Sequence, residues 1–392
     1  MQGCLPVRSE CDALVIGGGM AGASIAAHLA EHASVHLLEM EPQPGYHATG
    51  RSAAVFVEPY GNETVRALTR ASREFLYSPP PSFCSQRLVK PRSFLLVART
   101  DQASALQAFL HSVRASDAIE AKSAREALDL HPLLRPDDLF GAAFSPRSGD
   151  IDVNALHQGY LRLLQSRNGT ITTRAQVLAL DRSNGAWSVT TASQSIRSRI
   201  VVNAAGAWAG AIGKMADALD IGLQPLKRTV CLIDPPSGGK SDLWPMLVDA
   251  EELFYLKPDA GVLLLSPADE TETDPCDAYP DDLDVAVAVD RVERATTLEV
   301  TRVRRQWAGL RSFVKDRSPV VGFDPNSPGF FWLAALGGYG IQTAPALSRI
   351  AASLARGAAL DDDLLAHEIE PAALSPDRLL AGRTRYGYND PV

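Results

Sequence analysis

The stretch from Asp12 to Glu39, DALVIGGGMAGASIAAHLAEHASVHLLE, constrains the fold of this chain more than any other. A short apolar run that ends at Ile16 is followed by three glycines. An alanine-rich helical pattern then runs from Ala21 to Glu31, and a second apolar run leads to Glu39. This order predicts strand, tight turn, helix and strand, which form one βαβ unit of a parallel sheet.

The glycines of this unit match the G-x-G-x-x-G spacing of a dinucleotide-binding turn. Gly17 permits the tight turn, Gly19 lets the backbone approach a pyrophosphate, and Gly22 lets the helix pack closely on the strand. The phosphates would lie at the positive end of the helix. Glu39 suits a ribose diol and repels a 2′-phosphate, so NADP is disfavoured. A glycine turn without a ligand is the weaker alternative, and the motif alone leaves NAD and FAD open.

Length and composition limit the remaining possibilities. A chain of 392 residues that is 46% hydrophobic exceeds what one core normally holds, so we expect two domains. The net charge is -8 and the basic residues are scattered, which argues against a nucleic-acid partner. The cysteines lack zinc spacing, the N-terminus lacks a signal sequence, and no apolar run reaches a membrane span. We expect a cytoplasmic protein that binds a small molecule and no metal.

Patterns further along the chain predict the other elements. Three apolar strands, near residues 12, 199 and 330, each end in small residues where a ligand could approach the backbone. The Asn184-Gly185 pair predicts a hairpin, as does the stretch 254–265. Helices are expected at 61–78, within 102–130, at 151–167 with Asp150 or Asp152 as cap, and at 345–356 with Pro345 in the first turn. Residues 382–392 are expected to form a tail.

The spread of these strands predicts discontinuous domains. Residues 1–85, 142–212 and 320–392 would form the cofactor-binding domain, and residues 86–141 and 213–319 the substrate-binding domain. After Glu39 the sequence continues as MEPQPGYHATGRSAAVF, not as further alternating strands and helices. This loop, with Arg51, Ser52 and small residues, suits a long cofactor that runs across the sheet.

Five motifs carry a resemblance to a known family. PGYHATGRSAA, VVNAAGAWA, FYLKPDAG, WAGLRSF and GGYGIQT resemble the flavin-dependent D-amino-acid oxidase and glycine oxidase superfamily, and within it most closely the bacterial D-arginine dehydrogenases. The resemblance extends from about Asp12 to about Ser375. It implies an α/β two-domain flavoprotein, with a Rossmann-like FAD-binding domain of the glutathione-reductase-like, D-amino-acid-oxidase type and a mixed-sheet α+β substrate domain. One FAD would be bound noncovalently, because the last cysteine is Cys276 and covalent members carry one nearer the C-terminus.

The motif and the resemblance together imply a set of cofactor-binding residues. The glycines of the terminal motif would let the chain pass against the flavin ring, and the following helix would point its positive end at it. The predicted set is Gly17, Gly19, Ala21, Gly22, Glu39, Met40, Ala48, Thr49, Gly50, Arg51, Ser52, Ala53, Ala54, Val177, Gly206, Gly337, Gly338, Tyr339, Gly340, Ile341 and Gln342.

Four residues are implied at the reacting end. Arg311 is isolated in an apolar stretch, so it is either a carboxylate clamp or a surface charge, and the resemblance favours the clamp. Arg228 matches a second substrate contact, although the adjacent Lys227 keeps a solvated pair as an alternative. Tyr255 would donate its hydroxyl to the carboxylate and Tyr60 would lie on a mobile loop over the substrate. A half-buried packing role is the alternative for both tyrosines.

The chain departs from the D-arginine dehydrogenases in its predicted substrate pocket. Phe94 stands where those enzymes have a glutamate that binds the guanidinium, and Val55 and Val57 replace a histidine and a threonine. With Gly338 and Gln342 as further lining, the pocket predicts uncharged substrates.

The expected reaction is oxidation of a D-amino acid with an apolar or aromatic side chain, or of D-proline, by hydride transfer to FAD. The imino acid would hydrolyse to a 2-keto acid and ammonia. An N-methylated or other secondary amine, a 2-hydroxy acid, and a nucleotide-binding or redox-sensing protein without turnover are the alternatives. Oxygen, a quinone and a carrier protein all stay open as electron acceptor.

Overall fold

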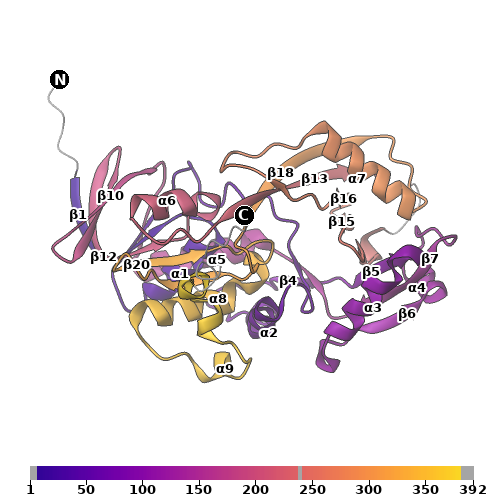
Figure 1. Ribbon diagram of the computed structural model, residues 1–392, viewed down its shortest axis with the longest axis horizontal. Helices are drawn as coiled ribbons and strands as arrows, with labels where there is room; N and C mark the ends of the chain where they lie inside the picture. Colours follow the sequence, from indigo (N-terminus) through magenta and orange to yellow (C-terminus); the bar gives the residue numbers. More distant parts are fainter. Residues whose placement is uncertain (1–6, 237–240, 381–392) are drawn as a thin grey trace, which may run out of the picture.

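The structure is a computed structural model that describes residues 7–236 and 241–380. Two large sheets organise these residues, and the predicted tail at 382–392 lies outside them (Figure 1). The first sheet has the strand order β10-β11-β12-β1-β2-β9, with β20 beside β12 and β19 beside β20. Its strands are β1 (Val7–Ile16), β2 (Val35–Leu38), β9 (Thr170–Thr172), β10 (Val177–Ser183), β11 (Ala186–Thr191), β12 (Gln194–Asn203), β19 (Val320–Phe323) and β20 (Phe330–Ala334).

The predicted βαβ unit is present at the centre of this sheet. β1 and β2 pair in parallel, and α1 (Met20–Leu29) connects them. Gly17 has φ +106°, a conformation that favours glycine, and a Cβ at Gly22 would lie 1.8 Å from the carbonyl oxygen of Gly17. The close packing of helix on strand therefore requires Gly22.

Helices cover the first sheet and bury its apolar residues. α8 (Gly340–Arg356) packs against α1 and against α2 (Glu63–Tyr77), and α5 (Val153–Ser166) packs against α1. Of the two caps considered for α5, Asp152 is the one used, because its Oδ1 accepts the Ala155 N–H at 2.8 Å. The short helices α6 (Ala209–Met215) and α9 (Asp362–Leu365) complete this part.

The predicted start of the C-terminal helix is wrong. Pro345 does not lie in the first turn, because α8 begins at Gly340 and Pro345 is its sixth residue. The predicted helix excludes the glycine-rich segment, whereas the last glycine of that segment, Gly340, is already helical. The positive N-terminal end of α8 therefore begins directly after Tyr339.

The second sheet is mixed and carries the longest antiparallel pair of the structure described. Its order is β17-β13-β16-β15-β14-β5-β7-β6, with β18 on β13, and the β13–β18 pair arches between the two parts of the molecule (Figure 1). Both predicted hairpins are present, β10–β11 and β15–β16. The strands are β5 (Phe94–Arg99), β6 (Glu120–Ser123), β7 (Leu139–Ser145), β13 (Gln224–Ile233), β14 (Met246–Asp249), β15 (Tyr255–Asp259), β16 (Val262–Ser266), β17 (Thr271–Glu272) and β18 (Val303–Phe313).

Three helices pack on this second sheet. A small third sheet is formed by strands from the segments that connect the two large sheets. The expected helical region 102–130 contains α3 (Ala103–Ser112) and α4 (Ala124–Leu130), separated by β6. The third helix is α7 (Asp282–Ala295). The small sheet contains β3 (Val55–Phe56), β8 (Gly149–Ile151) and β4 (Val89–Pro91). No helix among the described residues is both long and apolar enough to cross a membrane.

The architecture confirms the predicted α/β class. The first sheet draws its strands from residues 7–38, 170–203 and 320–334, and the second from 94–145 and 224–313. Each large sheet is therefore assembled from segments that are far apart in the sequence. The exact domain boundaries stay a prediction, and β7 runs across the one placed between residues 141 and 142.

Candidate cofactor and substrate site

Two adjoining cavities lie where the two sheets meet. The first, which we call the cofactor cavity, has a volume of about 340 Å³, and the second, the substrate cavity, about 420 Å³. Both volumes fall within the range of roughly 300–1,000 Å³ that is usual for ligand pockets. The residues that line both cavities are Ser52, Ala53, Arg228, Tyr255, Arg311, Gly338 and Ile341.

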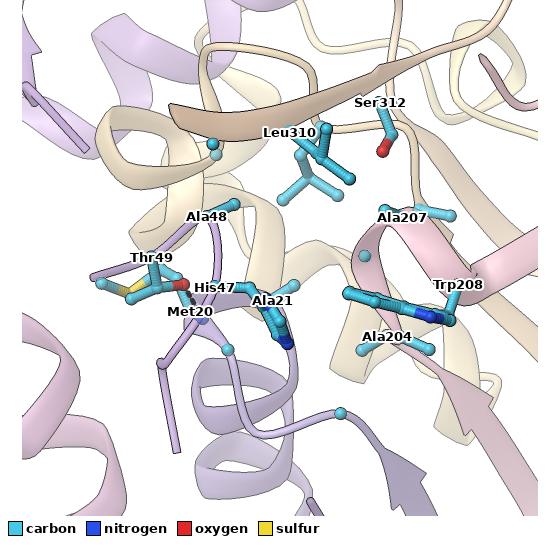
Figure 2. A pocket seen from close by; sticks show the side chains of 18 of the residues that line it. Met20, Ala21, His47, Ala48, Thr49, Ala204, Ala207, Trp208, Leu310 and Ser312 are labelled. Carbon is cyan, nitrogen blue, oxygen red and sulfur yellow. Dashed lines mark hydrogen bonds between the residues drawn. The ribbon is translucent and has the colours of Figure 1, made fainter. Parts of the chain in front are cut away.

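The cofactor cavity begins at the carboxyl ends of β1, β2, β12 and β20, as the strands with small C-terminal residues predict. Met20 N–H, at the first turn of α1, donates to Thr49 Oγ1 at 2.9 Å (Figure 2). Of the predicted cofactor residues, this cavity is lined by Gly17, Gly19, Ala21, Glu39, Met40, Ala48, Thr49, Arg51, Ser52, Ala53, Val177, Gly206, Gly337, Gly338, Gly340 and Ile341.

Five predicted cofactor residues lie elsewhere. Ala54, Tyr339 and Gln342 line the substrate cavity. Gly22 and Gly50 line neither cavity and instead permit tight packing, since a Cβ at Gly50 would lie 2.6 Å from the carbonyl oxygen of Gly45.

Glu39 holds the glycine turn as well as lining the cavity. Its Oε2 accepts the Gly18 N–H at 2.7 Å and its Oε1 accepts the Glu41 N–H at 2.8 Å. Burial raises the pKa of this carboxyl, although the two backbone hydrogen bonds oppose that shift. The side chain is 7% exposed, so it is fixed before any ligand arrives.

Two aromatic residues of the cofactor cavity were missed by the sequence-based prediction. His47 and Trp208 have ring centroids 4.6 Å apart, and both side chains are drawn in the cavity in Figure 2. His47 Nε2 lies 2.9 Å from Glu41 Oε1. Both residues belong to motifs that carried the family resemblance, GYHATG and AAGAWA, so the signal was present in the sequence.

Arg311 lies where the two cavities join. It forms no ion pair with any carboxylate of the described residues, although Arg228 and Arg317 nearby are both paired with Glu270. Burial by itself lowers the pKa of a guanidinium, but the neighbouring Tyr60 and Tyr255 raise that of Arg311 above its usual value. Arg311 is therefore a cation of the pocket without a carboxylate partner among the described residues.

The β13–β18 register places the second arginine beside the first. Leu226 faces Arg311 and Arg228 faces Gly309, so both arginines lie on the same face, diagonally across the pair. Arg228 is 5% exposed and its Nη2 is 3.1 Å from Glu270 Oε1. Lys227 lies on the opposite face, paired with Asp281 and Asp284, so the two neighbours do not form a solvated pair.

The two predicted tyrosines also reach this junction. Tyr255 is 7% exposed, lines both cavities, and has a buried hydroxyl with no hydrogen-bond partner within residues 7–236 and 241–380. Tyr60 lies in the segment between β3 and α2, lines the substrate cavity, and packs against Tyr339 with centroids 5.1 Å apart. Burial raises the pKa of Tyr60, so its phenol stays neutral, and Arg311 only partly opposes that shift.

The substrate cavity has a mainly apolar wall. The predicted residues Phe94, Val55 and Val57 line it, and Phe94 is 4% exposed at the start of β5. Gln342 is held in the lining, because its Oε1 accepts the Val57 N–H at 3.1 Å. The prediction missed two carboxylates that line the same cavity. Glu252 is exposed on the turn after β14 and has φ +55°, and Asp316 is paired with Arg378. The larger apolar side chains that line the substrate cavity include Val55, Val57, Phe94, Leu96, Phe109, Met246, Val248 and Phe254.

Comparison with known proteins identifies the family. Residues 12–354 match the family described as FAD dependent oxidoreductase, which is most of the chain. The chain belongs to this family. FAD is therefore its cofactor, and the predicted superfamily is confirmed.

The individual relatives share only a minority of their residues with this chain. The FAD-dependent oxidoreductase domain-containing protein 1 of Xenopus laevis is 28% identical over 178 residues, which cover 41% of this chain and 36% of that protein. Mouse mitochondrial dimethylglycine dehydrogenase is 25% identical over 283 residues, covering 68% and 31%. The chain thus spans about a third of the length of these relatives. The crystal structure of L-proline dehydrogenase from P. horikoshii has a TM-score of 0.80 at 20% identity, covering 96% of this chain and 99% of that one.

The residues of the cofactor cavity fit an FAD. The strand ends supply glycine and alanine where a dinucleotide must approach the backbone, and a Cβ at Gly19 would meet only Thr49 Oγ1, at 3.2 Å. The α1 and α8 N-termini both lie at the lining, which suits the pyrophosphate and the flavin ring respectively. Among the residues that the structure describes, no cluster of three His, Cys, Asp or Glu side chains is placed to hold a metal ion.

Proposed function

We propose that this oxidoreductase acts on the carbon–nitrogen bond of a small amino acid, with a D-amino acid of uncharged side chain as the preferred substrate. The product would be an imino acid that hydrolyses to a 2-keto acid and ammonia. One observation carries the proposal: Arg311 is a half-buried cation with no carboxylate partner among the described residues, at the junction of the cofactor cavity and the substrate cavity.

Arg311 and Tyr255 are suited to hold the substrate carboxylate. A guanidinium binds a carboxylate through two parallel hydrogen bonds, and the free hydroxyl of Tyr255 supplies a third donor. Arg228 adds positive potential, although its pairing with Glu270 makes it the weaker ligand. Bound FAD supplies the two-electron acceptor, and the protein's contribution is to orient the α-carbon towards it and to exclude water.

Tyr60 and the apolar wall would act on the rest of the substrate. Tyr60, in the segment between β3 and α2, is proposed to close over the bound molecule. Phe94, Val55 and Val57 would contact its side chain and disfavour a guanidinium or ammonium group. Of the two lining carboxylates, Asp316 is paired with Arg378, whereas Glu252 opposes this preference. Because Glu252 is exposed, solvent screening weakens its attraction for a cationic side chain.

Further proposals concern how FAD is bound and how the chain is divided into domains. We propose that FAD is bound noncovalently and that the predicted lining residues of the cofactor cavity contact it. We also retain the two discontinuous domains and the resemblance to D-arginine dehydrogenases, from which Phe94 would distinguish this chain.

A secondary or N-methylated amino acid is the second candidate substrate. The names of a related protein, dimethylglycine dehydrogenase, and of a structural neighbour, L-proline dehydrogenase, favour it. The same carboxylate site would serve these substrates, because they differ from primary amino acids only at nitrogen. A 2-hydroxy acid fits the clamp equally well but has no such support.

The visible spectrum of the holoenzyme tests these alternatives. Under anaerobic conditions the flavin should bleach with D-leucine, D-phenylalanine or D-proline faster than with D-arginine or D-lysine, and faster than with the L-enantiomers, sarcosine or 2-hydroxy acids. Preference for D-arginine or D-lysine would refute the uncharged side chain, and preference for sarcosine would support the second candidate. A flavin that stays oxidised with the whole panel would contradict the proposed enzyme.

A further inference from the structure

A segment outside the predicted site closes one side of the cofactor cavity. Residues 273–281, which we call the strap, connect β17 to α7 and contain no helix or strand. Cys276 and Ala278 of the strap line the cofactor cavity. The strap therefore forms part of the wall around the FAD site, although it belongs to the second sheet's side of the molecule.

Both ends of the strap are fixed to β13. At one end, the Thr273 N–H donates to the Pro225 carbonyl at 3.1 Å. At the other end, Asp281 forms an ion pair with the buried Lys227. These anchors hold the ends of the strap on the second sheet whatever the cavity contains.

The centre of the strap is bonded to the loop between β2 and β3, which contains Tyr46 and Arg51. Arg51 forms an ion pair with Asp277, and its Nη1 donates to the carbonyls of Ala278 and Ala308, each at 3.0 Å. Tyr46 lies under the guanidinium, 5.2 Å from ring centroid to Cζ, and its hydroxyl donates to Asp277 at 3.3 Å. Arg51 thus binds two residues of the strap, Asp277 and Ala278, and one residue of β18, Ala308.

Apolar packing completes the closed wall. Ala278 is 6% exposed and packs in one cluster with Ala207, Ala308 and Leu310, against which Trp208 also packs. Leu310 and Ala207 are both labelled among the lining residues of the cavity in Figure 2. The strap therefore bridges the β18 side and the β12 side of the cofactor cavity.

We propose that Asp277 is a positioning residue for cofactor retention: by holding Arg51, it keeps the strap across the cofactor cavity and slows the release of FAD. The ion pair persists in moderate acid, since the hydrogen bond from Arg51 lowers the pKa of Asp277. The proposal rests on FAD as cofactor and is independent of the substrate's identity.

Release of FAD from Asp277→Ala tests the proposal. Asp274→Ala is the matched control, because Asp274 is exposed on the same strap and is not bonded to Arg51. Flavin fluorescence recovered after dilution of the holoenzyme should rise about three- to tenfold faster in Asp277→Ala than in the wild type, since the pair is partly exposed. Asp274→Ala should release FAD at the wild-type rate, and Asp277→Glu should recover part of the difference. Equal rates for Asp277→Ala and Asp274→Ala would overturn the proposal.

Cys276 provides a second readout that requires neither catalysis nor flavin release. It is exposed at the rim of the cavity, whereas Cys11 and Cys231 are buried. Maleimide labelling of the FAD-loaded protein, followed by mass spectrometry of the Cys276 peptide, measures how firmly the strap is held. Labelling should be severalfold faster in Asp277→Ala than in Asp274→Ala. The same labelling rate in both variants would show that Arg51 and Asp277 do not hold the strap.

Discussion

The cofactor cavity and the substrate cavity adjoin each other but are built in different ways. The cofactor cavity is formed largely by backbone and small residues at the ends of parallel strands, where Gly19 and Gly206 leave space for a ligand. The substrate cavity is formed by large side chains from the mixed sheet and from two turns, including Phe94 and Tyr255. Binding at the first depends on local backbone geometry, whereas selectivity at the second depends on side chains that meet only after folding.

Replacing Arg311 should have the largest effect, and it should affect substrate turnover without affecting FAD binding. Arg311→Met is expected to lower kcat/KM about a thousandfold, because a buried charge pair with the substrate carboxylate is lost. FAD content should stay at the wild-type level, since the cofactor is held by other residues. Arg305→Met, an exposed position on the same strand, is the control and should have little effect on turnover. Loss of FAD together with activity in Arg311→Met would contradict the separation.

A change at the glycine turn, Gly22→Ala, should instead weaken FAD binding. A Cβ at Gly22 would lie 1.8 Å from a backbone oxygen that cannot move aside, so Gly22→Ala should displace α1 from β1. We expect FAD affinity to fall about a hundredfold, with a loss of about 3 kcal/mol in the free energy of unfolding. Gly210→Ala, where the added Cβ meets no atom within 4 Å, should leave both unchanged. Calorimetric FAD binding and urea unfolding measure the two quantities, and full FAD affinity in Gly22→Ala would refute this prediction.

Acid should lower the free energy of unfolding through a buried histidine on the substrate side of the molecule, His131. His131 is 1% exposed, neither ring nitrogen has a partner in the part of the chain that the structure describes, and burial lowers its pKa to about 4. Between pH 6.5 and 4 the unfolded chain therefore binds a proton that the folded chain does not, so stability falls as pH decreases, by up to about 3 kcal/mol. His131→Leu should flatten the dependence of urea unfolding on pH in this window. His32→Leu, which changes an exposed ring on the cofactor side, is the control. An unaltered slope in His131→Leu would exclude this origin.

The smallest expected effect concerns the hydroxyl of Tyr255. Tyr255→Phe should lower kcat/KM about tenfold, because one hydrogen bond to a charged group is removed. Its free energy of unfolding should not decrease, since the lost hydroxyl is buried and has no partner among the described residues when no ligand is bound. Stopped-flow flavin reduction and urea unfolding test the two parts, and a less stable Tyr255→Phe would show that the hydroxyl has a structural role instead.

Local patterns sufficed for much of the fold because they act within a few residues. The βαβ unit, the hairpin at Asn184-Gly185 and the Asp152 cap each follow from the steric and hydrogen-bonding needs of neighbouring residues. The helix start at Gly340 escaped prediction, because a glycine followed by a helical Pro345 contradicts the usual positional preferences. β13 and β18 were not predicted as strands, since their pairing is long-range and their residues alternate only weakly.

The sequence by itself determined that this chain binds a dinucleotide, and the motifs identified its family, because the glycine turn and Glu39 act over short distances. Only the tertiary structure decided which side chains meet at the reacting end. The β13–β18 register put Arg228 and Arg311 on one face. Glu270 pairs with Arg228, Arg311 has no carboxylate partner among the residues described, and Glu252 lies in the lining. The strap and its bond to Arg51 likewise join residues more than 200 positions apart. Such contacts depend on how two sheets pack, and no local preference of the sequence encodes them.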